Sequence, residues 1–230
     1  MSERVIAIDG PSGSGKGTIA ARLAKELGYS LLDSGALYRV LGLASQRAGL
    51  DPEQDFDAIA QLALDLPISF GRPDDSAPWQ EGSVWLAGDD VSLQIRTDEA
   101  SALASQVAAI PAVRTNLLQR QRDFLQGEGL VADGRDMGTT VFPNSPLKIY
   151  LTASVEARAE RRYKQLIAKG IDAILPALLR ELQERDERDM QRSVSPLKPA
   201  EDAIIIDSTD LSIEDVMSQV LGLTREKLSN

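Results

Sequence analysis

The sequence predicts an α/β protein with a five-stranded parallel sheet, helices on both faces and a small antiparallel β insertion. Three observations point to this class. The aliphatic run Val5–Ile8 enters a glycine-rich loop that leads directly into a helical pattern. Short apolar runs alternate with longer amphipathic segments along most of the chain, as in successive βαβ units. The alternation is interrupted between Pro67 and Ile95 by short β-rich runs bounded by turn residues.

The strands of the sheet are expected where aliphatic residues form short runs. These runs cover residues 5–8, 29–32, 130–132, 147–151 and 203–206. Helical periodicity is found over residues 19–27, 36–48, 53–64, 96–126 with a break at Pro111, 154–169, a charged stretch ending at Arg192, and 211–228. Because each strand is followed by a helix, the strands are expected to be mainly parallel.

The interruption between Pro67 and Ile95 predicts an antiparallel ribbon. Its strands are expected at 68–70 and 83–87, followed by a turn at 88–90. Both tryptophans, Trp79 and Trp85, fall in this insertion, where local packing is their expected role.

The composition excludes several reaction classes. The 230 residues include no cysteine and no histidine, so disulfides, thiol nucleophiles, Ser–His triads and His or Cys metal sites are absent. Phosphoryl transfer remains possible because its catalysis depends on positioning and charge neutralisation. A net charge of −10 argues against general binding of nucleic acid polymers or anionic membranes. No leader segment or membrane span is seen, so a cytoplasmic protein is expected. A monomer is expected as well.

The glycine-rich loop is the strongest chemical signal in the chain. It matches G-x-x-x-x-G-K-[ST] from Gly10 to Lys16, but Gly17 follows the lysine and Thr18 comes one place later. Glycines let main-chain N–H groups close around phosphate oxygens, while Lys16 and the helix N-terminus add positive charge. The loop therefore predicts a polyphosphate site. The displaced hydroxyl predicts that magnesium is held mainly through waters and phosphates.

Carboxylates follow two other predicted strands. In parallel sheets ligands bind beyond the carboxyl ends of the strands. Asp33 and Asp133, each expected one residue past its strand, are therefore candidates to orient waters on a magnesium ion bound to nucleotide phosphates. The alternative for Asp33 is a helix cap.

Arginines fall into three groups: Arg114, Arg120 and Arg122; Arg158, Arg161 and Arg162; Arg185, Arg188 and Arg192. In an acidic protein that binds an anionic substrate, such groups are expected where the substrate lies. The alternative for the last group is a solvated helix face with i,i+4 ion pairs, which stays open on spacing alone.

Five segments together resemble bacterial-type cytidylate kinases, members of the nucleoside monophosphate kinase family of P-loop proteins. They cover residues 10–18, 32–39, 105–109, 132–139 and 185–189, in that family's order and over essentially the whole chain. The glycine after Lys16 is similar to the loop of that family. The resemblance implies transfer of the γ-phosphoryl group of ATP to CMP or dCMP, with Mg²⁺ as the cofactor and these nucleotides as the partners.

The resemblance also implies a role for individual residues. The ATP phosphates would be held by Gly10, Pro11, Ser12, Gly13, Ser14, Gly15, Lys16, Gly17 and Thr18. The catalytic cations would be Lys16, Arg39, Arg135, Arg161 and Arg162, the last two in a lid over the phosphates.

For CMP, the resemblance implies a phosphate clamp, a base-reading group and ribose contacts. The residues implied for these roles are Ser34, Arg39 and Arg135 at the phosphate, Ser105, Arg114, Asp136 and Arg192 at the cytosine, and Arg185 and Asp189 at the ribose.

The same resemblance implies a single kinase domain over residues 1–230. Its core would comprise about 1–35, 97–152 and 195–230, with a CMP-binding region at 36–96 that contains the β insertion near 67–95. The lid and the arginine-rich helices would cover 155–192.

Three other functions share part of this pattern. A kinase of another small acceptor, such as UMP, AMP or a shikimate-like molecule, would keep the loop but leave Ser105, Arg114 and Asp136 unexplained. A regulatory GTPase is disfavoured because neither Asn-Lys-x-Asp nor Asp-x-x-Gly occurs in the sequence. A non-catalytic nucleotide-binding module would need no second arginine clamp.

Overall fold

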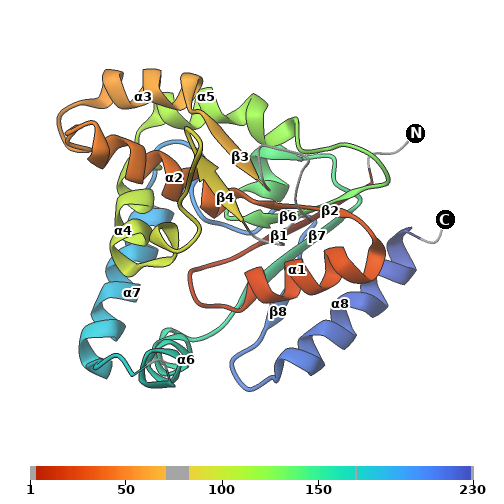
Figure 1. Ribbon diagram of the computed structural model, residues 1–230. Coiled ribbons are helices and arrows are strands. Elements are labelled where there is room, and N and C mark those ends of the chain that lie inside the picture. Colours follow the sequence, from red (N-terminus) through yellow and green to blue (C-terminus); the bar gives the residue numbers. More distant parts are fainter. Residues whose placement is uncertain (1–3, 71–82, 169, 229–230) are drawn as a thin grey trace. The chain divides into compact units, whose positions relative to one another are not determined.

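The computed structural model describes residues 4–70, 83–168 and 170–228. The chain forms two compact units, Met1–Asp33 with Gln121–Asn230, and Ser34–Arg120 (Figure 1). None of the helices within the described ranges is both long and apolar enough to cross a lipid bilayer.

The first unit is built on a five-stranded sheet in which every strand is parallel to its neighbours, in the order β2-β6-β1-β7-β8. The strands are β1 Val5–Asp9, β2 Ser30–Asp33, β6 Leu130–Gly134, β7 Leu147–Thr152 and β8 Ile204–Asp207. All five predicted strands are thus confirmed, as is their parallel arrangement.

The positions of Asp33 and Asp133 correct one detail of the prediction. Both residues lie inside strands, Asp33 at the end of β2 and Asp133 within β6, and they are register partners. Sequence patterns ended β2 one residue early and β6 two residues early, because aspartate and glycine are poor strand formers. The register places the two carboxylates on the same face of adjacent strands.

The helices of the first unit are α1 Lys16–Leu27, α6 Val155–Ala168, α7 Leu175–Met190 and α8 Ile213–Leu228, with a short π-helix, η2, at Met137–Val141. The π-helix was not predicted. Helices α1 and α8 lie side by side (Figure 1). Their apolar faces form one core with Ile6 and Ile8 of β1. Val5 and Ala7, on the opposite face of β1, are also fully buried, so both faces of the central strand are covered.

The second unit contains α2 Ser34–Arg47, α3 Phe56–Asp65, the 3₁₀ turn η1 Gln94–Arg96, α4 Asp98–Val107 and α5 Pro111–Arg122, whose last two residues are assigned to the first unit. Helices α2 and α4 pack closely. A Cβ atom on Gly42 of α2 would lie 2.9 Å from Leu103 Cβ of α4, so this contact requires glycine. Pro111 begins α5, the position at which its missing N–H costs no hydrogen bond.

The predicted antiparallel ribbon is confirmed for its described residues. It consists of β3 Ile68–Phe70, β4 Val84–Leu86 and β5 Asp89–Asp90, in that order. The residues predicted as a turn include β5, and the reversal instead lies at Ala87–Gly88, where both residues have positive φ. Trp85 lies in β4, and Trp79 falls outside the described residues.

The core around β1 makes a stability prediction. Ile8→Ala is expected to lower the free energy of unfolding by about 2–5 kcal/mol, because the side chain is fully buried and its removal leaves a cavity. The matched control is Ile205→Ala on the edge strand β8, where the side chain is 60% exposed and the expected loss is below about 1 kcal/mol. Urea unfolding followed by circular dichroism measures both, and equal losses would contradict this core assignment.

Candidate active site

The loop between β1 and α1 has the backbone that a phosphate site requires. Gly10, Gly13 and Gly15 have φ values of 154°, 79° and 93°. A Cβ atom on Gly10 would lie 2.0 Å from the Leu151 carbonyl oxygen of β7, so no other residue fits there. The glycines therefore serve a close main-chain approach and a left-handed turn.

Lys16 closes the loop from its carboxyl end. It is the first residue of α1 and is buried, and its Nζ donates a hydrogen bond to the Pro11 carbonyl oxygen at 3.2 Å. Burial lowers the pKa of Lys16 to about 8, and the nearby Arg135 and Arg185 act in the same direction, while Asp133 opposes them. A buried ammonium beside a glycine-rich loop at a helix N-terminus is a site that favours an anion.

Gly17 explains the departure from the common loop motif. A Cβ atom at this position would lie 3.2 Å from Asp133 Oδ2, so a serine or threonine would crowd the carboxylate. Glycine avoids this close contact with Asp133, the register partner of Asp33. Within the described ranges no three acidic residues form a metal cage. Two adjacent carboxylates beside a phosphate loop fit a hydrated magnesium ion that is held chiefly by the nucleotide.

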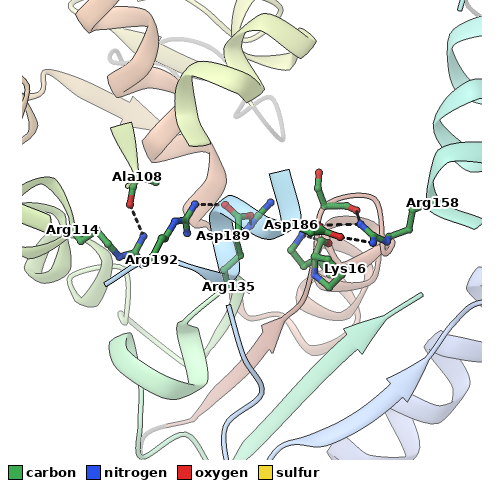
Figure 2. A network of polar contacts seen from close by, with 10 residues as sticks. Lys16, Ala108, Arg114, Arg135, Arg158, Asp186, Asp189 and Arg192 are labelled. Atoms are coloured by element: carbon green, nitrogen blue, oxygen red, sulfur yellow. Dashed lines mark hydrogen bonds and ion pairs between the residues drawn. The ribbon is translucent and has the colours of Figure 1, made fainter. Parts of the chain in front are cut away.

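Arg135 leaves the sheet beside the loop. Gly134 at the end of β6 is the register partner of Asp9 at the end of β1. Arg135 and Gly10 are therefore the first residues after two neighbouring strands. The Arg135 Nε donates to Asp189 Oδ2 of α7, and Arg192 donates to Asp189 Oδ1 (Figure 2).

These pairs keep both partners charged. Burial raises the pKa of Asp189, but the guanidinium groups of Arg135, Arg192 and Arg185 outweigh it and hold the pKa below its usual value. Burial alone would lower the pKa of Arg135, and Asp189 more than offsets this. The Arg192 side chain is 4% exposed, so the solvated-helix alternative is wrong for this residue.

Two further arginines of the first unit contact main-chain carbonyls near the loop. Arg161, predicted as a lid residue, donates to Ser208 Oγ at 3.2 Å and to the Ser208 carbonyl oxygen, just after β8. Ser208 Oγ in turn donates to the Ser14 carbonyl oxygen of the loop at 3.2 Å. Arg158 donates to the Ser12 carbonyl oxygen at 2.9 Å. The lid role of Arg161 and Arg162 stays a prediction.

Of the remaining predicted residues, Asp136, buried shortly after β6, Arg162 on α6 and Arg185 on α7 belong to the first unit. Four others belong to the second unit. Ser34 begins α2, which also carries Arg39, and Ser105 lies buried on α4. Arg114 on α5 is buried, and its guanidinium carbon lies 5.4 Å from the centroid of the Tyr38 ring. It also donates to the Ala108 carbonyl oxygen at 3.4 Å. It stays a prediction that these four residues and those of the first unit bind the same acceptor nucleotide.

Sequence reasoning missed two buried carboxylates that support the site. Asp186 pairs with Arg158, and Asp9 accepts hydrogen bonds from the Met137 and Gly138 N–H groups, both at 2.8 Å. Burial raises the pKa of Asp9 to about 7. An acidic residue that ends an otherwise apolar strand was a usable signal for Asp9. No sequence signal distinguishes Asp186 from the other charges of α7.

A parallel sheet, a glycine-rich loop that closes on Lys16, and an arginine at the adjacent strand end define a phosphate-loop nucleotide-binding protein. Residues 6–226 match the family described as cytidylate kinase. The cytidylate kinase of Stutzerimonas stutzeri (strain A1501) is 58% identical over 95% of this chain and 93% of its own length. That of Shewanella pealeana (strain ATCC 700345 / ANG-SQ1) is 54% identical over 99% and 98%, respectively. The chain belongs to the cytidylate kinase family.

The pKa of Lys16 makes a prediction about pH. Its ammonium is present below about pH 8 and lost above it, whereas a bound polyphosphate raises the pKa again. Above about pH 7, where the terminal phosphate of ATP is already ionised, ATP affinity is therefore expected to change little up to pH 8 and then to fall by at most about tenfold per pH unit. Isothermal titration calorimetry across this range measures the trend. Lys16→Arg, which stays charged, is the control and should show no such fall; a pH-independent affinity in the unmodified protein would contradict the burial of a titrating Lys16.

Proposed function

We propose that this protein transfers the γ-phosphoryl group of ATP to CMP or dCMP, giving ADP and CDP or dCDP. Family membership over almost the whole chain supports the reaction. The structural observation that carries it is the pairing of Asp9 with Gly134 in neighbouring strands. The phosphate loop follows the first of these strand ends, and Arg135 follows the second. An anion cradle and a largely buried guanidinium at adjacent strand ends suit two phosphate groups that react with each other.

On the donor side, the main-chain amides of the Gly10–Thr18 loop would hold the ATP phosphates. Lys16 would neutralise charge on the γ-phosphoryl group as it moves to the acceptor, which is the electrostatic stabilisation that phosphoryl transfer needs. Mg²⁺ would supply further charge neutralisation when bound with ATP. The adjacent carboxylates of Asp33 and Asp133 would hold it through water.

On the acceptor side, Arg135 and Arg39 would clamp the CMP phosphate, with Ser34 beside it. The Nε of Arg135 donates to Asp189. The terminal nitrogens of Arg135 are therefore the ones that would face a phosphate. Two guanidinium groups fix a phosphate in orientation better than ammonium groups, because each contact is planar and bidentate. Arg185 and Asp189 would contact the ribose.

The base would be read by Asp136 together with Ser105, Arg114 and Arg192. Cytosine presents an N4 amino donor beside an N3 acceptor, so a carboxylate paired with a donor side chain complements it. Uracil reverses both groups and would place a carbonyl oxygen against the carboxylate. We therefore assign CMP and dCMP, rather than UMP, as acceptors. Residues 36–96 would form the CMP-binding region, and residues 155–192, with Arg161 and Arg162, a lid that excludes water.

The acceptor assignment predicts a substrate order. ADP release in a coupled assay is expected to be fastest with CMP and dCMP, and slower by at least about tenfold with UMP or AMP, because a mismatched base leaves buried polar groups unpaired. A preference for UMP or AMP would overturn the base-reading residues. Binding of ATP without any binding of CMP would instead indicate a non-catalytic module.

The assigned cations make a second prediction. Lys16→Ala and Arg135→Ala are each expected to lower kcat by about 100-fold or more, because each removes charge stabilisation in the transition state. The matched control is Arg22→Ala, which removes an exposed ion pair with Glu214 on α8 and should leave kcat unchanged. Circular dichroism checks that the variants remain folded, and near-normal turnover in either variant would overturn its role.

A further inference from the structure

Arg158 lies at the start of α6 and uses its donors within the protein. Its side chain is 5% exposed. The Nε donates to the Ala153 carbonyl oxygen at 3.0 Å, and Nη1 donates to the Ser12 carbonyl oxygen at 2.9 Å. Asp186 of α7 accepts from both terminal nitrogens, at 3.2 Å and 2.5 Å (Figure 2). One guanidinium thus joins the phosphate loop, the end of the sheet and helix α7.

The contact with Ser12 sets the direction of one loop amide. A trans peptide is planar, so its carbonyl oxygen and its N–H point in opposite directions. Because the Ser12 carbonyl oxygen accepts from Arg158, the N–H of Gly13 in the same peptide points away from Arg158. A Cβ atom on Gly13 would lie 3.3 Å from Arg158 Cβ, so the arginine also packs directly against the outside of the loop.

A buried ion pair of this kind is poorly explained by stability alone. Taking both charges out of water costs free energy, and well-packed apolar residues of similar size often stabilise a fold equally well or better. The guanidinium instead offers several donors in a rigid plane, which can hold a carbonyl and a carboxylate in fixed directions at once. That property is useful where a main-chain group must be oriented.

Helix α7 supports the donor loop and Arg135 through separate carboxylates. Asp186 holds Arg158, and Asp189, about one turn later, holds Arg135 and Arg192. The contacts of Arg158 with Ser12 and Asp186 involve a different carboxylate from the one that holds Arg135 and Arg192. A change confined to Arg158 should therefore affect the donor side and leave the Asp189 pairs intact.

We infer that Arg158, held by Asp186, is a positioning residue that turns the Ser12–Gly13 peptide so that the Gly13 N–H faces the donor phosphates. The inference rests on the proposed function, because it takes ATP as the ligand of the loop. A preorganised amide adds affinity because it needs no reordering when the phosphates arrive. Without Arg158 this peptide is free to rotate, and the loop binds phosphate less tightly.

The test compares Arg158→Lys with Arg22→Lys, in which an exposed ion pair between α1 and α8 undergoes the same change. Lysine keeps the charge beside Asp186 but cannot reach Ser12, Ala153 and Asp186 together. Titration calorimetry measures Kd for ATP, for inorganic tripolyphosphate and for CMP. In Arg158→Lys, Kd is expected to rise about tenfold for ATP and for tripolyphosphate, and to change less than about twofold for CMP. Arg22→Lys should bind all three as the unmodified protein does.

A second variant separates a loss of ATP binding from misfolding of the first variant. Asp186→Asn keeps the size and one acceptor oxygen while removing the charge, and is expected to weaken ATP binding but not CMP binding. Unchanged ATP affinity in Arg158→Lys would overturn the inference, as would equal losses for ATP and CMP together with a lower Tm, or failure of both variants to fold. Failure of the unmodified protein to bind ATP or CMP would overturn the proposed function itself, which is a separate result.

Discussion

Burial of positive charge around one loop is the constraint on which the rest of this structure depends. Lys16, Arg135, Arg158 and Arg192 are all largely withdrawn from water. Such groups remain charged only where carboxylates or hydrogen-bond acceptors replace the lost hydration. The guanidinium groups have dedicated carboxylates, Asp186 and Asp189. Lys16 has a main-chain carbonyl and only nearby carboxylates, and its pKa is lowered accordingly.

This difference between the arginines and Lys16 suits two tasks. The arginines are fixed in place by carboxylates, so they can hold a group in a set direction. Lys16 is incompletely compensated, so it gains most when an anion enters the loop. Local concentration of positive charge also explains how a chain with a net charge of −10 can bind nucleotides.

Much of the fold was predictable from particular residues. The five aliphatic runs, the glycines of the loop and Pro111 each report a local backbone requirement, and all were interpreted correctly. The errors were the missed π-helix η2 and several element boundaries. Asp33 and Asp133 lie inside strands, because pairing with a neighbouring strand overrides a weak local preference. Asp89 and Asp90 form a strand rather than a turn for the same reason.

The candidate site, like the fold, was predictable from the sequence only in part. The sequence by itself determined the phosphate loop, the class of chemistry and the family, because these depend on residue types at fixed spacing along the chain. Only the tertiary structure decided that Asp186 supports Arg158, that Asp189 joins Arg135 to Arg192, and that Gly17 faces Asp133. Those partners are far apart in sequence or lie on a helix with many similar charges. Their pairing follows from the register of the sheet and the packing of α7, which no local pattern encodes.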